Sequence, residues 1–223
     1  MEPPERADVL SNGYGDCKDK STLLTALLAA SGIEAYPALI NSSGKIDPDM
    51  PYPGQFDHVI TALPHGKSYT FLDTTTEVGP FGYLVPTLRG AKALVIPDNG
   101  PATLIETAPN PPFKSFFNFQ SDGSLDDSGT YQGKMQISTR GDLELAYRFA
   151  FREAGEAQWT PLMQKASGNL GFGGTVTNTT ISAPDATDAP FQIQYNYNRE
   201  KFGDWDDKAN HGSRSSCFCP SSA

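Results

Sequence analysis

The most constraining feature of the sequence is a run of Ser, Thr, Leu and Ala over residues 21–31, which contains no Gly or Pro and stops at Gly32. Its leucines recur at helical spacing, and a glycine suits the left-handed position just past a helix end. The pattern predicts a helix over residues 17–31, capped by Asp16, with Cys17 in its first turn. Unpaired N–H groups and the positive end of the helix dipole favour a thiolate there. The sequence therefore predicts a nucleophilic cysteine at a helix start.

A base and an orienting carboxylate for that cysteine are found on a predicted hairpin. His58 lies at the start of a strand predicted over 57–63, and a second strand over 69–73 ends on Asp73 after a short polar turn. Such a pair forms an antiparallel hairpin, so we expect the two side chains to lie close to opposite one another near its open end. Asp73 would then accept a hydrogen bond from one ring nitrogen and leave the other facing Cys17. The sequence predicts a Cys–His–Asp triad in chain order.

Several segments of the first half resemble the bacterial transglutaminase-like superfamily, which belongs to the wider papain-like thiol fold. They are Gly-Asp-Cys-Lys-Asp-Lys at 15–20, the segment 32–40, Phe-Asp-His-Val-Ile at 56–60, and Phe-Leu-Asp-Thr-Thr at 71–75. The resemblance implies Cys17 as the nucleophile, His58 as general base and acid, and Asp73 as the orienting carboxylate. It also implies an α+β fold whose nucleophile helix packs on an antiparallel sheet, followed by a second α+β region.

The second half has a weaker likeness to the region that follows this core in a subgroup of large secreted or periplasmic bacterial proteins, carried by segments 171–176 and 201–205. In that subgroup a β-rich domain precedes the core, and only sixteen residues precede Cys17 here. We therefore expect an N-terminally incomplete core from a periplasmic or secreted parent. The first residues, 1–6, have neither a basic start nor an apolar stretch, so we expect no signal peptide in this chain.

An N-terminally incomplete core would affect the oxyanion site more than the rest of the active site. Acyl transfer through a thioester needs donors aimed at the developing oxyanion, and the Cys17 backbone N–H is one candidate. The resemblance implies a second donor from a side chain upstream of the nucleophile. We expect that donor to be missing or to be replaced by Tyr14.

The composition narrows the classes of partner that the protein could bind. The chain has 223 residues, a formal charge of −9 and no basic cluster, which argues against nucleic acid and anionic membranes as partners. No apolar run approaches the roughly 20 residues that cross a bilayer. No calcium-loop pattern is present, and the triad chemistry needs neither a metal nor another cofactor. We predict a thiol core over 1–107, a linker at 108–112, an α+β region over 113–208 and a disordered tail over 209–223.

Further elements are predicted from periodicity and turn residues. In the first half these are strands over 34–40 and 94–96, and a long loop over 41–55 that is a candidate rim of the substrate cleft. Residues 141–151 fit both an alternating strand and a helix, and we favour the helix. The second half is otherwise predicted to contain strands over 113–120, 130–139, 175–183 and 191–198, a helix over 156–167, and turns at 122–123 and 126–127.

The combined prediction is thiol-dependent acyl transfer on a peptide or carboxamide bond of a peptide or protein substrate. Water or an amine resolves the thioester, and hydrolysis is favoured because water is the default acceptor. One alternative is a binding module that keeps the fold with a dormant triad. Another is a redox or metal role for Cys17 together with Cys217 and Cys219, which lie in the polar tail. The charged residues at 18–20 are interpreted as a solvated helix face, and the sequence assigns no oligomeric state.

Overall fold

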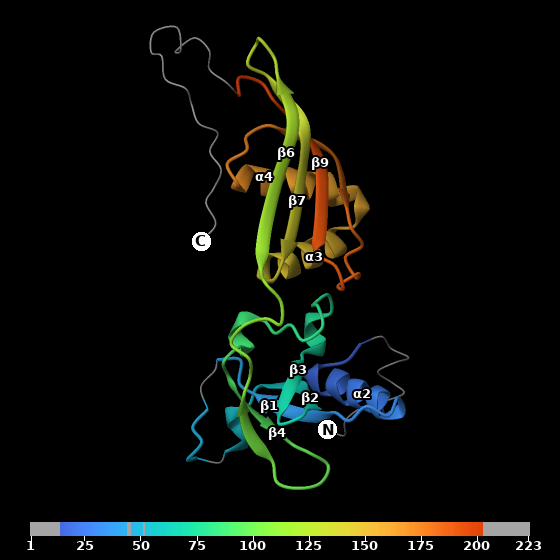
Figure 1. Cartoon of the computed structure of the whole chain (residues 1–223), viewed down its shortest axis with the longest axis vertical. Helices are drawn as coiled ribbons and strands as arrows, with labels where there is room; N and C mark the ends of the chain where they lie inside the picture. Colours follow the sequence, from blue (N-terminus) through green and yellow to red (C-terminus); the bar gives the residue numbers. More distant parts are fainter. Residues whose placement is uncertain (1–13, 44–45, 51, 203–223) are drawn as a thin grey trace. The chain divides into compact units, whose positions relative to one another are not determined.

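The protein is an α+β protein, seen in a computed structural model that describes residues 14–43, 46–50 and 52–202 (Figure 1). Its described residues form two compact units whose segments alternate along the chain. The first unit comprises 14–117, 139–150 and 183–191, and the second comprises 118–138, 151–182 and 192–202. The predicted linker at 108–112 has irregular backbone, and the predicted domain boundaries stay a prediction. Cys217, Cys219 and the predicted tail lie outside the described residues.

The predicted nucleophile helix is present as α2, Cys17–Ala30, and it begins with a reciprocal cap. The Asp16 carboxylate accepts hydrogen bonds from the Lys18 and Asp19 amides at 2.8 and 3.1 Å. The Asp19 carboxylate accepts the Asp16 amide at 3.1 Å, which completes a capping box. After the helix, Gly32 adopts φ +73°, the left-handed conformation expected of a glycine at this position. The prediction for this helix is confirmed to within one residue at its C-terminal end.

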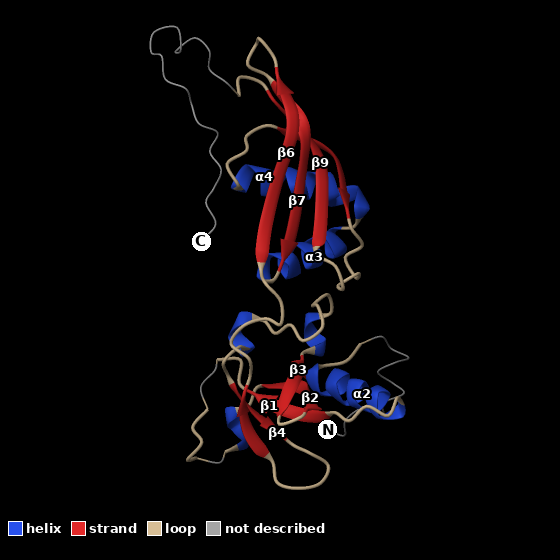
Figure 2. Ribbon diagram, in the orientation of Figure 1, coloured by secondary structure: helices blue, strands red, loops and turns tan. Residues whose placement is uncertain are grey.

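The first unit contains a five-stranded antiparallel sheet in the order β3-β2-β1-β4-β5 (Figure 2). Its strands are β1 Tyr36–Ile40, β2 His58–His65, β3 Ser68–Leu72, β4 Lys92–Val95 and β5 Thr103–Glu106. The predicted hairpin is confirmed: β2 pairs with β3, and His65 lies opposite Ser68 across the turn. The strand predicted over 94–96 corresponds to β4, whereas β5 was not predicted.

Strand β2 lies between β3 and β1 and has buried residues on both of its faces. Ile60 and Ala62 belong to the apolar core of the unit, which also takes residues from β1 and β4. Thr61, between them, is fully buried and its hydroxyl is 2.9 Å from the hydroxyl of Ser21 on α2. Helix α2 therefore packs against the sheet through β2, and the apolar core covers the opposite face.

The second sheet has four strands in the order β6-β7-β9-β8, and most of its residues belong to the second unit. Its strands are β6 Phe116–Leu125, β7 Tyr131–Arg140, β8 Thr175–Ile181 and β9 Phe191–Arg199, and the helices are α3 Asp142–Ala154 and α4 Trp159–Asn169. The helix preferred over 141–151 is confirmed by α3. The helix predicted over 156–167 is confirmed as α4 preceded by a short 3-10 turn at Glu156–Gln158.

One predicted turn in this half is wrong. Residues 122–123 lie inside β6 rather than in a turn. A Cβ atom on Gly123 would meet the Gln132 carbonyl oxygen at 2.4 Å and the Gly133 Cα at 2.7 Å. Gly123 is therefore required because two backbones come close together inside the sheet. In the sequence, such a glycine cannot be distinguished from one in a turn. The turn predicted at 126–127 is confirmed by the Asp126 amide, which donates to the Thr130 carbonyl at 3.0 Å.

Candidate active site

Cys17 is the first residue of α2 and carries a half-buried, free thiol. Its backbone N–H differs from its neighbours in the first turn. The Lys18 and Asp19 amides are bound by the Asp16 carboxylate, whereas within the described part of the chain the Cys17 amide has no hydrogen-bond acceptor. A helix start with one uncommitted amide beside a thiol can donate to an oxyanion that forms there.

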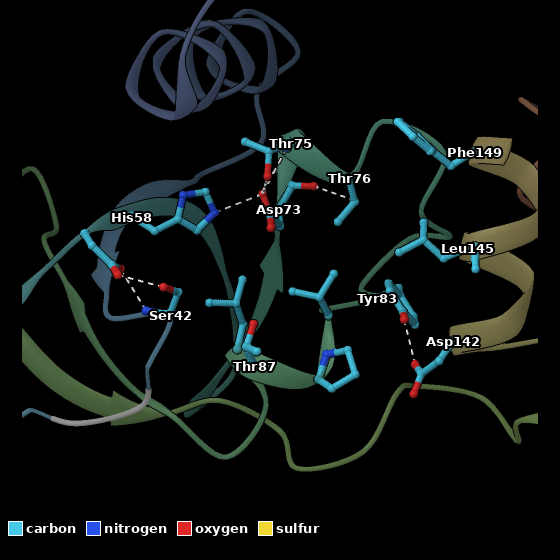
Figure 3. Close-up of a pocket in the computed structure, with 15 residues that line it drawn as sticks. Ser42, His58, Asp73, Thr75, Thr76, Tyr83, Thr87, Asp142, Leu145 and Phe149 are labelled. Atoms are coloured by element: carbon cyan, nitrogen blue, oxygen red, sulfur yellow. Dashed lines mark hydrogen bonds and ion pairs between the residues drawn. The ribbon is translucent and has the colours of Figure 1, made fainter. Parts of the chain in front are cut away.

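His58 and Asp73 form a hydrogen-bonded ion pair at the open end of the β2–β3 hairpin (Figure 3). The His58 Nε2 atom lies 3.2 Å from Asp73 Oδ1, and their side chains are 16% and 2% exposed. The hairpin register pairs Thr61 with Leu72, so its continuation places Asp73 opposite Ile60. The histidine and the aspartate are thus diagonal neighbours rather than nearly opposite, still within reach of long side chains.

Asp73 is held in its ionised form by several donors. It directly follows β3, and its Oδ1 accepts the Thr75 amide at 2.9 Å and the Thr75 hydroxyl at 2.7 Å. Burial acts to raise the pKa of this carboxyl, but the hydrogen bonds from His58 and Thr75 outweigh burial and lower the pKa below its ordinary value of 3.8. A buried carboxylate therefore faces the imidazole at neutral pH.

Two neighbouring residues, Asp73 and Cys17, favour the protonated form of His58. The hydrogen bond to Asp73 is the largest, burial opposes it, and a hydrogen bond with the Cys17 thiol adds to it, which together raise the pKa of His58 from 6.5 to about 9. Because Nε2 faces Asp73, the ring nitrogen left for Cys17 is Nδ1. The structure therefore brings His58 and Asp73 into direct contact and places Cys17 near enough to affect the pKa of His58.

A second carboxylate, Asp57, lies directly before His58 and was not predicted as part of the site. Its two oxygens accept the Ser42 amide at 2.7 Å and the Ser42 hydroxyl at 2.6 Å. These two hydrogen bonds lower the pKa of Asp57 below 3.8. Ser42 belongs to the loop predicted as a cleft rim over 41–55. Nothing in the local sequence signals this contact, because its partners are fifteen residues apart.

A cavity of about 620 Å³ opens beside the His58–Asp73 pair. Its lining residues all belong to the first unit: Ser42, Asp57, His58, Asp73, Thr75, Thr76, Tyr83, Val85, Pro86, Thr87, Leu88, Asp142, Leu145, Ala146 and Phe149. Figure 3 shows Leu145 and Phe149 projecting from α3 beside the strands and turns that carry the ion pair. Most of the wall away from the ion pair is apolar. Cys17 is not among the lining residues.

Helix α3 reaches this wall through a polar contact that the sequence did not reveal. The Tyr83 hydroxyl donates to Asp142 Oδ1 at 2.6 Å, and the Arg89 guanidinium also binds the Asp142 carboxylate. Tyr83 and Asp142 are 59 positions apart in the chain. No local pattern signals contacts of that range.

Residues 14–43, 46–50 and 52–202 contain no group of three or more His, Cys, Asp or Glu side chains placed to hold a metal ion. None of the helices in those ranges has the length and apolar character needed to cross a bilayer. Tyr14, the expected substitute oxyanion donor, has a side chain that is 81% exposed.

Comparisons with protein-family models, with curated proteins and with solved structures find no match to this chain. The site is therefore interpreted from its own geometry and from general chemistry.

Proposed function

We propose that this protein catalyses thiol-dependent acyl transfer on peptide or carboxamide bonds, using Cys17, His58 and Asp73 on a transglutaminase-like core. The observation that carries the proposal is the imidazole of His58. It is held by the Asp73 carboxylate at 3.2 Å on one side, and the Cys17 thiol lies near enough to contribute to its raised pKa. A nucleophile, a base and an orienting carboxylate in that relation are the minimum set for covalent acyl chemistry.

The first step forms a thioester. The Cys17 sulfur, its proton held by His58, attacks the carbonyl carbon, and the C=O electrons move to the oxygen. The Cys17 amide, which does not share in the hydrogen bonds from Lys18 and Asp19 to the Asp16 carboxylate, donates to this developing charge. When the tetrahedral adduct collapses, the C–N bond breaks and the His58 imidazolium gives its proton to the leaving amine. Asp73 stabilises the imidazolium throughout, and stays ionised because its pKa is lowered.

The second step releases the acyl group. An acceptor, water or an amine, loses a proton to neutral His58 as its oxygen or nitrogen bonds to the thioester carbon. The C–S bond then breaks, and the thiolate and imidazolium are restored. Water gives a carboxylic acid and makes the protein a peptidase or amidase, whereas an amine gives a new amide. We favour hydrolysis, because an acceptor amine must be bound in place of abundant water.

The test is capture of the acyl-enzyme. The full chain, with Cys217→Ser and Cys219→Ser so that one thiol reports, is mixed with a library of peptide amides at pH 7 and analysed by mass spectrometry after acid quench. The expected result is an acyl adduct on Cys17, and turnover that falls by at least about 10³-fold in Cys17→Ser and His58→Ala. A dansylated primary amine added in parallel distinguishes transfer from hydrolysis.

A binding module with a dormant triad is the second candidate, and one observation favours it. The cavity beside His58 is lined by residues from several elements, yet Cys17 is not one of them. In this case a peptide would occupy the cavity without reaching the thiol. Peptide binding that is equal in the wild type and Cys17→Ala, with no adduct on Cys17 for any peptide amide, would establish this candidate and exclude acyl transfer.

A further inference from the structure

One ion pair connects the nucleophile helix to the turn that carries Asp73. Lys20 lies three residues after Cys17, so both project from the same face of α2. Its Nζ is 2.7 Å from Oε1 of Glu77, which lies four residues after Asp73. The side chains of Lys20 and Glu77 are 27% and 44% exposed, so Lys20, within the charged run 18–20, has a specific partner outside the helix.

The turn that ends at this ion pair has a strained backbone. Glu77 adopts φ 46° and ψ −48°, a region that non-glycine residues rarely occupy, and the Val78 amide donates across it to the Thr76 carbonyl. Such tight turns persist only where their surroundings hold them, and they concentrate at functional sites. The Thr76 hydroxyl donates to the Asp73 carbonyl at 2.8 Å. The conformation of Glu77 is therefore coupled to that of Asp73.

A second link joins the same helix face to the strand that carries His58. Ser21 is four residues after Cys17, and its hydroxyl is 2.9 Å from that of Thr61, three residues after His58. Both residues are buried, at 1% and 0% exposed. The helix is thus fastened to β2 and to the Asp73 turn by adjacent residues of one helical turn.

The Lys20–Glu77 ion pair and the Ser21–Thr61 hydrogen bond together restrict the position of the Cys17 thiol. Sliding α2 by one residue would move Cys17 by about 1.5 Å, whereas hydrogen-bond lengths vary by only about 0.5 Å. One link alone would leave the helix free to rotate about it. Two links, to two different segments, oppose both sliding and rotation.

We infer that Lys20, Glu77, Ser21 and Thr61 are positioning residues, which hold the segments of Asp73 and His58 in register with the Cys17 thiol. None of them touches the reacting atoms. The inference rests on the proposed acyl-transfer function, because it assigns these side chains the task of assembling that site.

The first test uses Lys20→Met and Glu77→Gln in the full chain, with His58 titrated by NMR of its ring protons. If the two charges act only through their electric fields, Lys20→Met raises the pKa of His58 and Glu77→Gln lowers it. If the ion pair positions the site, both variants lower the pKa from about 9 toward 6.5, because both misplace Asp73 and Cys17. The groups that face His58, which are Asp73, Cys17 and Asp57, are unchanged in every variant.

The charge-reversed pair, Lys20→Glu with Glu77→Lys, is the rescue. It should return the His58 titration most of the way to that of the wild type and restore Cys17 alkylation by iodoacetamide at pH 7, which each single variant slows about tenfold. Lys18→Met, which removes an exposed lysine from the same helix, is the matched control and should change neither readout. Thermal midpoints should move by no more than about 4 °C, since the pair is partly exposed.

The second link is tested by Ser21→Ala combined with Thr61→Val, which removes both hydroxyls so that neither is left unsatisfied. We expect a small change in thermal midpoint and about a tenfold loss of Cys17 alkylation rate. Thr25→Val is the control, because its hydroxyl donates to the Ser21 carbonyl one turn along α2, at 2.9 Å, and has no other hydrogen bond among the described residues.

The outcomes separate this inference from the proposed function. A wild type whose His58 titrates near pH 9 but that never forms an acyl adduct refutes acyl transfer and leaves positioning standing. Shifts of opposite sign in Lys20→Met and Glu77→Gln, or no shift in either, refute positioning and leave acyl transfer standing. A wild-type His58 that titrates near its ordinary value of 6.5 overturns both.

Discussion

Two clusters in the first unit each pair a buried carboxylate with a cation, and they differ in how completely their hydrogen bonds are used. Glu144 and Arg148 on α3 are both fully buried. Arg148 commits all five N–H donors of its guanidinium, to Glu144 and to the carbonyls of residues 183, 184 and 189. The His58–Asp73 pair, in contrast, satisfies one ring nitrogen with a carboxylate and leaves the other to a titratable thiol.

The difference separates a cluster that holds shape from one that can do chemistry. A saturated buried network resists any change of charge, because each donor already has a partner and the charged groups are buried. The Glu144 carboxylate is also bound by Arg140 at 3.0 Å and by the Gly141 amide at 3.1 Å, which anchors the start of α3. The His58 site borders a cavity and contains groups that can exchange a proton. Burial of an ion pair alone therefore does not indicate function, whereas a pair that lies beside a cavity and next to a second titratable group is a candidate for chemistry.

The largest effect is expected when the saturated Glu144–Arg148 cluster is broken. Arg148→Met leaves Glu144 buried without its main partner, and we expect the free energy of unfolding to fall by about 3–5 kcal/mol. Denaturant unfolding of the full chain measures the loss. Arg152→Met, which removes an arginine 27% exposed from the same helix, should cost at most about 1 kcal/mol. Equal losses in the two variants would contradict the structural role assigned to Arg148.

An intermediate effect is expected from Asp73→Asn, which weakens the functional pair while keeping its shape. The pKa of His58 should fall from about 9 toward 6.5, because its strongest stabilising partner is lost. Alkylation of Cys17 at pH 7 should slow by about 30-fold, equivalent to about 2 kcal/mol. Asp57→Asn is the matched control, since that carboxylate precedes His58 but is bound by Ser42. If Asp57→Asn had the larger effect on both readouts, Asp57 rather than Asp73 would be the orienting carboxylate.

The smallest effect is expected in the pH dependence of the free energy of unfolding. The pKa of His58 is raised on folding, so its contribution is fully present below about pH 6.5 and is lost as the pH rises through about 9. The unfolding free energy should therefore decrease across that window, by roughly 1 kcal/mol once solvent screening is allowed for. Asp73 has a lowered pKa, so its contribution is lost on the acid side, as the pH falls below 3.8.

The pH effect is measured by urea unfolding at intervals from pH 6 to 9.5 in the wild type and in His58→Ala. The slope assigned to His58 should disappear in the variant. An unchanged slope in His58→Ala would show that another group titrates in this window.

The elements of the first unit that the sequence predicted best are those specified by neighbouring residues. Helix α2 is set by its Asp16 cap, its apolar run and Gly32, all within one short segment. The β2–β3 hairpin is set by two apolar runs around a turn, and its register follows from the turn. The proximity of His58 and Asp73 therefore followed from local pattern, although their diagonal placement depends on the exact register.

The parts that the sequence did not predict involve partners far apart in the chain. The contact of Ser42 with Asp57, the approach of Asp142 to Tyr83 and the Arg148 cluster all join segments with no pattern in common. Gly123 shows the converse error, in which a residue typical of turns serves a close backbone contact inside β6.

By itself the sequence determined the helix that begins at Cys17, the hairpin that brings His58 toward Asp73, and the choice of thiol chemistry as the leading hypothesis. These depend on backbone preferences and side-chain periodicity, which act over a few residues. Only the tertiary structure decided the hydrogen bonds that raise the pKa of His58, the cavity beside it, and the links from Lys20 and Ser21 that fasten the helix. Those depend on burial and on distances between remote segments, which exist only once the chain has packed.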